Sequence, residues 1–296
     1  MEVKTKKFKR DLLNWYKNNK RDYSWRETND PWKILLLETI SQQTQLDRAD
    51  TYFQLFIKEF PNPETMASSS LKKVLILWSG LGYNNRAKRL YESSKILCET
   101  GFDELYPNFE VLPGVGPYTN NAILSFAYHK KVITRDVNVD RVFSRYFGVD
   151  EVKTFIHNNK KPLLDRVSSR DLNQAIMDFG SMVCKSKNPL CSSCVLENNC
   201  KKYIVKIKRP QEAFSGSNRE LRGDLLKLLL SNNKLSLKKI EKTLSVDREK
   251  LLKATTTLEK DGLITIKKNI VNTKKKQEAF SGSNRELRGD LLKLLL

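Results

Sequence analysis

The stretch from Leu112 to Thr119 reads LPGVGPYT and lies between two segments of helical apolar periodicity. Two glycines within three residues allow a tight turn with positive φ, and proline is favoured in the first turn of a helix. A turn of this kind presents free backbone N–H groups at a helix N-terminus, where a phosphate can bind. A purely structural turn would fit the same residues. We predict a glycine hairpin between two helices, with Gly114, Val115 and Gly116 as candidate contacts to a nucleic-acid backbone.

Apolar residues recur at helical spacing along most of the chain around this hairpin. Asp30 is placed to cap, and Pro31 to open, a helix that runs through Ile40. Similar patterns run over residues 46–60, 71–78, 86–97, 119–128, 139–146 and 172–182. No sustained period-two alternation precedes residue 263, so the fold class of the body is predicted to be all-α. Cys98 falls on one of these helices and is expected to be a small core residue.

The chain of 296 residues carries a net charge of +20 and has an isoelectric point near 9.7. Residues 201–296 contain 24 basic and 11 acidic side chains, so the excess is concentrated there. Such an excess favours a polyanionic partner, most simply nucleic acid, although a solvated lysine-rich surface is the alternative. The composition excludes wholesale disorder, and the sequence shows neither a membrane span nor a signal peptide. We expect an intracellular protein, cytoplasmic and nucleoid-associated or, in a eukaryote, nuclear, with no membrane partner.

Four of the five cysteines are crowded into 17 residues with the spacing C-x6-C-x2-C-x5-C. In an intracellular protein, this crowding indicates a metal centre rather than disulfides. The candidate ligands are Cys184, Cys191, Cys194 and Cys200. A tetrahedral zinc site and a four-iron cluster both suit four thiolate ligands, and the spacing alone does not separate them well.

The composition of the chain changes to lysine-rich after Lys201. Pro210 and the run from Ser215 to Ser217 are typical of a linker. Helical patterns follow over residues 219–230, 237–244 and 247–260, and two short strands over 263–266 and 270–271. Three helices closed by a small β-ribbon are the order of a winged helix-turn-helix, with Lys267 and Lys268 at the ribbon.

Residues 211–230 recur identically at 277–296. Two copies, the second cut after one helix, do not make a stacked-repeat architecture. One helix cannot bury its apolar face alone, so the second copy is interpreted as a recent duplication or an artefact rather than a functional module.

The hairpin, the Asp136 that follows it and the cysteine spacing together resemble the helix-hairpin-helix DNA glycosylases of the endonuclease III superfamily. Within it, the chain is similar to adenine-specific mismatch glycosylases of the MutY type, over roughly residues 8–203. The resemblance implies a two-lobed helical core with one [4Fe–4S] cluster per chain, held by the four cysteines. The resembled enzymes usually carry a Nudix-like domain where this chain has its winged-helix-like segment. The expected domains are an iron–sulfur domain of residues 1–27 and 135–205, a six-helix domain of 28–134, the winged-helix-like domain of 206–273 and the partial repeat of 274–296.

Glu38 is the first candidate catalytic acid, in the run ETISQQTQ of residues 38–45. On a helical wheel it falls between Ile34 and Leu35, inside the apolar sector. A carboxylate there should be desolvated, with its pKa raised toward that of a general acid near neutral pH. A glutamate at the rim of the apolar face is the structural alternative. The resemblance implies that Glu38 protonates N7 of adenine, which makes the base a better leaving group.

Asp136 is the second candidate acid and lies 18 residues beyond Tyr118. That separation allows one helix and a return, which can bring the aspartate back toward the mouth of the hairpin. An ionised carboxylate beneath the sugar stabilises the oxocarbenium character that develops when a glycosidic bond breaks. The resemblance gives this role to Asp136 rather than to Asp140, and gives Asn138 a supporting hydrogen bond. Capping of the following helix is the alternative, and it can coexist with catalysis.

The remaining candidates concern the reaction subtype and the extrahelical nucleotide. Bifunctional relatives have a lysine at the position of Tyr118, and a phenol cannot form the Schiff base that permits strand cleavage. A lyase lysine elsewhere in the chain is the alternative.

Gln43 and Tyr83 match family positions that fill or wedge the space that the extrahelical nucleotide leaves in the duplex. Positions near the base pocket are matched by Trp25, Arg26 and Gln174, with a core position as the alternative for the tryptophan.

These residues predict a monofunctional, monomeric DNA glycosylase of base excision repair whose partner is double-stranded DNA with a mismatch or an oxidised guanine. It would remove adenine paired with 8-oxoguanine or guanine. A thymine or uracil glycosylase acting on T/G or U/G mismatches shares the Tyr and Asp pattern, but residues 42–44, QQT, favour the adenine branch. A non-catalytic DNA-binding regulator with a metal cluster is a third alternative, which Glu38 and Asp136 together disfavour.

Overall fold

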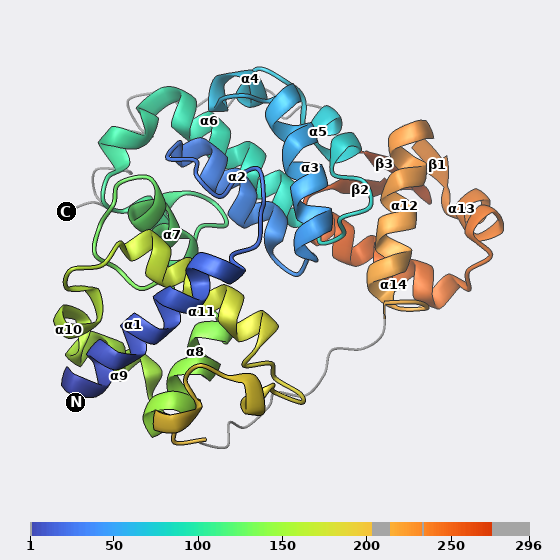
Figure 1. The fold of residues 1–296 in the computed structure, drawn as a ribbon. Coiled ribbons are helices and arrows are strands. Elements are labelled where there is room, and N and C mark those ends of the chain that lie inside the picture. The colour runs from blue at the N-terminus through green and yellow to red at the C-terminus, as the bar shows by residue number, and fades with distance from the viewer. Residues whose placement is uncertain (1, 203–213, 233, 274–296) are drawn as a thin grey trace. The chain divides into compact units, whose positions relative to one another are not determined.

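The computed structural model describes residues 2–202, 214–232 and 234–273 (Figure 1). The chain divides into two compact units. Unit 1 comprises Met1–Leu35 and Gly116–Arg209, and unit 2 comprises Leu36–Val115 and Pro210–Leu296. The domain boundaries expected from the sequence, after residues 27 and 134, stay a prediction. The chain passes between the two compact units at residues 35 and 36 and again at residues 115 and 116. The elements before residue 202 are all helical, which confirms the all-α body for that part of the chain.

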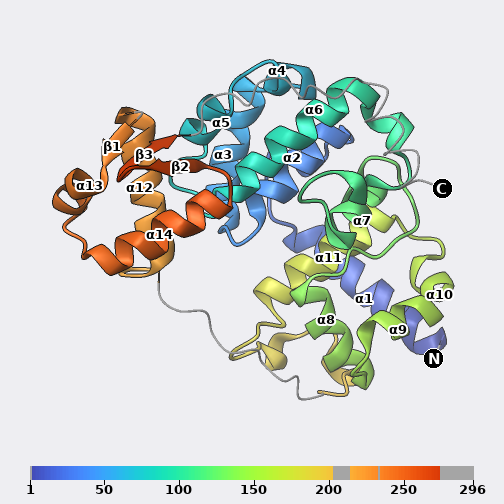
Figure 2. The same cartoon turned by 180° about the vertical axis from the view of Figure 1, so that it is seen from behind.

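Unit 1 is built on α1 (Glu2–Asn19) and α11 (Ser169–Met182), which pack against each other (Figures 1 and 2). Its core is aromatic: Phe8 lies 4.9 Å from Tyr146 and 5.2 Å from Phe147 between ring centroids. The other elements are α7 (Pro117–Phe126), α8 (Val137–Phe143), the π-helical turn Ser144–Gly148, α9 (Val152–Asn158), α10 (Lys160–Leu164) and the 3₁₀ turns Cys191–Ser193 and Glu197–Asn199. Both α7 and α8 pack on α11, which thereby carries the candidate site of this unit.

The first segment of unit 2 is a helical layer in which α6 (Asn85–Leu105) packs on α4 (Pro63–Ala67) and α5 (Leu71–Leu77). Asn62 and Ser70 cap α4 and α5 by accepting backbone N–H groups, as short polar side chains do at an N-cap. Gly101, with φ +73°, breaks α6 into two pieces. The remaining elements are α3 (Leu46–Glu59), the 3₁₀ turn Phe109–Val111 and the second half of α2 (Pro31–Ser41), a helix that begins in unit 1 and that Asp30 caps as predicted.

The second segment of unit 2 contains three helices and a small sheet. They are α12 (Asn218–Asn232), β1 (Lys234–Ser236), α13 (Leu237–Leu244), α14 (Arg248–Lys260), β2 (Ile264–Lys267) and β3 (Ile270–Thr273). The antiparallel sheet has the order β1-β3-β2, with Val271 paired to Leu235 on one side and Ile266 on the other. The three helices and the ribbon confirm the elements expected there. Strand β1 was not predicted, because three residues are too few to show a period of two.

Two further expectations from the sequence concern Cys98 and the repeat at 277–296. Cys98 is exposed on α6, so its expected place in the core is wrong: the neighbouring Leu97 takes the buried position of that helical turn. The repeat at 277–296 lies outside the described residues. Among the described residues, no helix is both long and apolar enough to cross a membrane.

Candidate active site

The glycine hairpin has the predicted form. Gly114 takes a positive φ of +86°, a conformation that favours glycine, and a Cβ atom there would make a tight contact of 3.1 Å with Cβ of Arg89. Gly116 instead has an extended backbone and is the N-cap of α7, with Pro117 in the first turn. Of the two glycines, only Gly114 needs positive φ. Tyr118 follows on the first turn of α7 and is half-buried.

Asp136 is the N-cap of α8, and both of its carboxylate oxygens are engaged. Oδ1 accepts the backbone N–H groups of Asn138 at 2.9 Å and Val139 at 2.7 Å. Oδ2 accepts the side-chain amide of Asn138 at 2.8 Å. The expected supporting hydrogen bond from Asn138 is therefore present, and the capping role is present with it. Two backbone bonds and one side-chain bond fix the orientation of this carboxylate.

Burial raises the pKa of Asp136 above its usual value of 3.8, because desolvation penalises the charged form. The hydrogen bonds from Val139 and Asn138 and the nearby charge of Arg141 oppose this shift and lower the pKa. Asp140, the rival acid, is half-exposed and forms an ion pair with Arg135 at 2.5 Å. Asp136 is thus the desolvated acid of the two.

Helix α11 approaches the Asp136–Asn138 pair at Gly180. A Cβ atom on Gly180 would lie 2.7 Å from Cβ of Asn138, closer than packed carbons allow. Arg141 ties the two helices together by donating to Asn138 Oδ1 at 2.6 Å and to the Gly180 carbonyl at 2.5 Å. The absence of a side chain at Gly180 is what lets α8 and α11 meet at this point.

Glu38 lies on α2 in unit 2, and its side chain is 7% exposed. Its neighbours Leu37 and Ile40 are buried as well, which confirms the expectation that this glutamate lies in the apolar sector of the helix. The backbone directly after Glu38 is held by a buried cation, since Arg86 donates to the carbonyls of Thr39 at 2.9 Å and Ile40 at 3.1 Å.

Arg86 is a structural residue that the sequence did not reveal. Besides Thr39 and Ile40, its guanidinium donates to the carbonyls of Gln42, of Leu81 at 3.2 Å and of Gly82 at 3.2 Å. It therefore joins the loop after α2 to the loop before α6. Burial lowers the pKa of Arg86 to about 10, since five neutral carbonyls and no carboxylate face it among the described residues. Trp78, whose indole donates to the Gly82 carbonyl at 2.9 Å, packs under the guanidinium.

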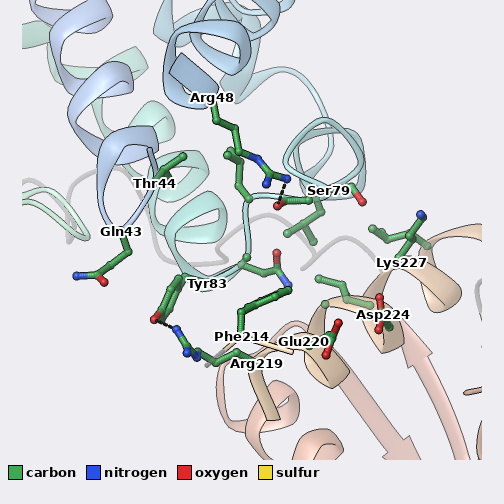
Figure 3. A pocket seen from close by; sticks show the side chains of 18 of the residues that line it. Gln43, Thr44, Arg48, Ser79, Tyr83, Phe214, Arg219, Glu220, Asp224 and Lys227 are labelled. Carbon is green, nitrogen blue, oxygen red and sulfur yellow. Dashed lines mark hydrogen bonds between the residues drawn. The ribbon is translucent and has the colours of Figure 1, made fainter. Parts of the chain in front are cut away.

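The two loops joined by Arg86 present Gln43 and Tyr83. Both residues have positive φ, +58° and +47°, and both line a pocket of about 670 Å³ (Figure 3). The opposite wall of the pocket is α12 and the residues before it. Arg219 of α12 donates a hydrogen bond of 2.8 Å to the Tyr83 hydroxyl, and its guanidinium lies 5.8 Å from the Tyr83 ring centroid. The structure thus brings together the two residues that the sequence assigned to the vacated duplex.

Trp25, Arg26 and Gln174 lie together in unit 1. The Arg26 guanidinium donates to Gln174 Oε1 at 3.2 Å and forms an ion pair with Asp178 at 2.9 Å. Gln174 Nε2 returns a hydrogen bond of 3.3 Å to the Arg26 carbonyl. Trp25 stacks on Tyr23 at 5.1 Å and is half-buried, so it is not a core residue. A base pocket at these residues stays a prediction.

The four clustered cysteines are free thiols at the edge of unit 1. Cys184, Cys194 and Cys200 pack against its core, and Cys191 is exposed. Arg145 donates to Cys184 Sγ at 3.5 Å, and burial together with the neighbouring cysteines raises the pKa of Cys194 to about 11. Within the part of the chain that the structure describes, no three His, Cys, Asp or Glu side chains are grouped closely enough to hold one metal ion.

Comparison with known proteins defines the class. Residues 37–161 match the HhH-GPD superfamily of base excision DNA repair proteins. A thermostable thymine-DNA glycosylase superposes with a TM-score of 0.62 at 27% identity, covering 68% of this chain and 97% of that one. An endonuclease III from a trapped DNA complex superposes with a TM-score of 0.57 at 19% identity, covering 68% of this chain and 96% of that one, which is a likeness of fold alone.

Similarity to curated proteins narrows the class. The adenine DNA glycosylase of Mycobacterium tuberculosis (strain CDC 1551 / Oshkosh) is 32% identical over 234 residues, covering 74% of this chain and 77% of that protein. The adenine DNA glycosylase of Buchnera aphidicola subsp. Baizongia pistaciae is 34% identical over 206 residues, covering 67% and 58%. The chain belongs to the adenine DNA glycosylase family. It spans 58% to 62% of the length of the Buchnera relatives that it matches.

Proposed function

We propose that this protein is a DNA glycosylase that removes adenine paired with 8-oxoguanine or guanine, by hydrolysing the N-glycosidic bond of a nucleotide turned out of double-stranded DNA. The observation that carries the proposal is the Asp136–Asn138 arrangement, a desolvated carboxylate held in one orientation by three hydrogen bonds. It occurs in a chain whose relatives are adenine DNA glycosylases.

Two acidic residues, Glu38 and Asp136, have different roles in the proposed reaction. Glu38, which is buried, donates a proton to N7 of adenine. The electron pair of the C1′–N9 bond then leaves with the base, and the ionised Asp136 stabilises the oxocarbenium character on the sugar. Water adds at C1′, and the proton that it loses passes to the Glu38 carboxylate, which restores the acid. Convergence of Glu38 and Asp136 on one nucleoside is part of this proposal.

Tyr118 supports a monofunctional reaction. A phenol on the first turn of α7 cannot form a Schiff base with C1′ of the sugar, so water is the final nucleophile and the product is an abasic site. Trp25, Arg26 and Gln174 would line the base pocket, while Gln43 and Tyr83 would fill the space that the extrahelical nucleotide leaves.

The four clustered cysteines would hold one [4Fe–4S] cluster. Their donor set fits, because all four are free thiols within 17 residues and positive or N–H donors lie beside the sulfurs, such as Arg145 at Cys184 and the Lys202 amide at Cys200. When bound, the cluster would brace this loop, residues 183–202, as part of a DNA-binding surface.

The second segment of unit 2 is proposed to be a winged-helix-like domain that binds DNA. The order of three helices and a β1-β3-β2 sheet supports this assignment. So do the two lysines at the β2–β3 connection, Lys267 at the end of β2 and Lys268 in the turn. We propose that the protein acts as a monomer.

The test is base release from duplexes that carry A:8-oxoguanine, A:G, T:G or U:G pairs. Release of adenine from the first two, with intact strands, is the expected result. A thymine glycosylase is the second candidate, favoured by the likeness to the thermostable thymine-DNA glycosylase, and it would release thymine from T:G. A non-catalytic regulator would release nothing from any duplex.

A further inference from the structure

Four arginines line one small pocket of unit 2. The pocket has a volume of about 240 Å³ and contains Arg86 and Arg89 of α6 together with Arg219 and Arg222 of α12. The rest of its wall is formed by Tyr83, Asn84, Asn85, Leu258, Asp261 and Leu263. Asp261 is the one carboxylate among these lining residues, so positive charge is in excess in the pocket.

Among the described residues, the carboxylate of Asp261 forms no ion pair with Arg86, Arg89 or Arg222. Its Oδ1 atom accepts the Asn85 amide at 3.5 Å, and its backbone carbonyl accepts Lys88 Nζ at 2.8 Å. Within the described part of the chain, neither Arg89 nor Arg222 has a hydrogen bond or an ion pair to a protein group. Like charges brought together without counter-charges repel one another, and this cost is relieved by a bound anion.

Two of the guanidinium groups also carry buried donors without partners. Nε of Arg86 and Nε of Arg222 are buried, and neither finds an acceptor among the described residues. Arg86 is itself nine-tenths buried. Buried N–H donors are normally paired, so unpaired ones at a cationic pocket indicate an acceptor that is supplied from outside the chain.

The first turn of α6 adds a further positive potential. The helix begins at Asn85, beside the pocket, and among the described residues no side chain caps its N-terminus. The positive end of the helix dipole and its free N–H groups therefore act in the same direction as the arginines. Planar guanidinium groups match the oxygens of a phosphate in pairs, which makes phosphate the anion class that this pocket fits best.

We propose that this four-arginine pocket binds a phosphate group, and that the backbone of the DNA supplies it. The proposal rests on the proposed function in that the DNA is the duplex being repaired. The pocket shares Tyr83 and Arg219 with the larger pocket that Gln43 lines, so the phosphate belongs to the stretch of strand next to these candidate wedge residues. Helix α12 thereby contributes to DNA binding together with α6.

The test measures DNA binding rather than base release, so it decides this proposal even if the chemistry proposed above is wrong. Binding of the full chain to an undamaged duplex is followed by fluorescence anisotropy over a series of salt concentrations. In Arg89→Gln/Arg222→Gln, we expect the affinity at low salt to fall about tenfold. The slope of log K against log salt should decrease by about 0.9, the loss of one neutralised phosphate. Arg89→Lys/Arg222→Lys keeps the charge and should keep the slope.

The matched control is Arg10→Gln on α1, an exposed arginine that pairs with Asp11 outside this pocket and should bind DNA like the parent protein. Thermal melting of each variant establishes that it is folded. An unchanged salt slope in the folded Arg89→Gln/Arg222→Gln variant would overturn the proposal. So would a pocket that takes only free phosphate, seen as stabilisation by orthophosphate that the variant loses while its DNA binding stays intact.

Discussion

The side-chain amide of Asn138 donates to one oxygen of Asp136 at 2.8 Å, while the other oxygen accepts two backbone N–H groups of the same helix. The carboxylate is therefore a helix cap and a candidate catalytic group at once. Three hydrogen bonds hold the Asp136 carboxylate in one orientation, so its position is set before any substrate binds. Preorganised charge of this kind is the most effective form of electrostatic stabilisation in a buried site.

Replacement of Asp136 by asparagine should separate these two roles. Asparagine caps helices as well as aspartate does, so Asp136→Asn should fold and should bind DNA like the parent protein. Loss of the negative charge should lower the rate of base release about 10²- to 10³-fold in single-turnover measurements. A variant that no longer binds DNA would show instead that Asp136 has a structural role only.

The raised pKa of Asp136 predicts the acid limb of the pH profile. Because the proposed reaction uses the ionised carboxylate, the rate should fall as the pH decreases through a value above 3.8. Asn138→Ala removes a hydrogen bond that lowers this pKa, so the limb should move to higher pH. The exposed Asn158→Ala on α9 is the control and should leave the limb in place. A limb that stays unchanged in Asn138→Ala would contradict the assignment of Asp136.

The same shift has a consequence for folding stability. A carboxyl whose pKa is higher in the folded than in the unfolded chain binds more protons when folded, so its contribution to the free energy of unfolding decreases as the pH rises from 3.8 through the folded value. Asp136→Asn abolishes this contribution. The free energy of unfolding of the parent protein minus that of the variant, both measured with urea, should therefore decrease as the pH rises through that window.

Glu38→Gln tests the proposed general acid. Glutamine preserves the size of the side chain but has no proton of suitable acidity, so base release should fall about 10²- to 10⁴-fold while DNA binding persists. Glu104→Gln, an exposed change on α6, is the matched control. Base release that is retained in Glu38→Gln would remove Glu38 from the mechanism.

Arg86→Ala tests how much the hydrogen bonds of Arg86 to the end of α2 and to the loop before α6 stabilise the protein. The substitution removes one buried donor group from five backbone carbonyls, of which Gly82 keeps the Trp78 indole, and the free energy of unfolding should decrease by about 3 kcal/mol or more. Denaturant titration measures this change, with the exposed Glu99→Ala on the same helix as the control. A loss below about 0.5 kcal/mol would mean that the carbonyls find water instead.

The cysteines predict the metal content. Purified protein should contain iron and sulfide in the ratio of one [4Fe–4S] cluster per chain, together with its visible absorption. Cys194→Ser should lose both, whereas Cys98→Ser, at an exposed cysteine outside the cluster loop, should keep them. Zinc in place of iron would contradict the cluster and favour the tetrahedral alternative.

Local signals made most of the helical framework predictable. Helix α13 was predicted with its observed bounds, because the helical apolar spacing runs from Leu237 to Leu244; in the structure, Ser236 caps this helix. The burial of Glu38 followed from its place on a helical wheel, and the capping role of Asp136 followed from its residue type. In each case, residues within one or two helical turns contain the whole signal.

Contacts between distant segments were not predictable in this way. Arg86 lies in the run NRAKRL, where it resembles any basic residue on a helix surface, and three of its acceptors, the carbonyls of Thr39, Ile40 and Gln42, lie 44 to 47 residues earlier in the chain. The pairing of Arg219 with Tyr83 spans 136 residues and has no local signal either. The polar groups that set the shape of a site are therefore the part that required the structure.

Gly180 bears no functional group, but the closest approach of two helices depends on its missing side chain. Even a single methyl group there would push on Asn138 and disturb the carboxylate behind it. In a mutational scan, such a change would be scored as a loss of catalysis at a site that never meets the substrate. The number of positions that are intolerant to substitution will thus exceed the number of residues that perform the reaction.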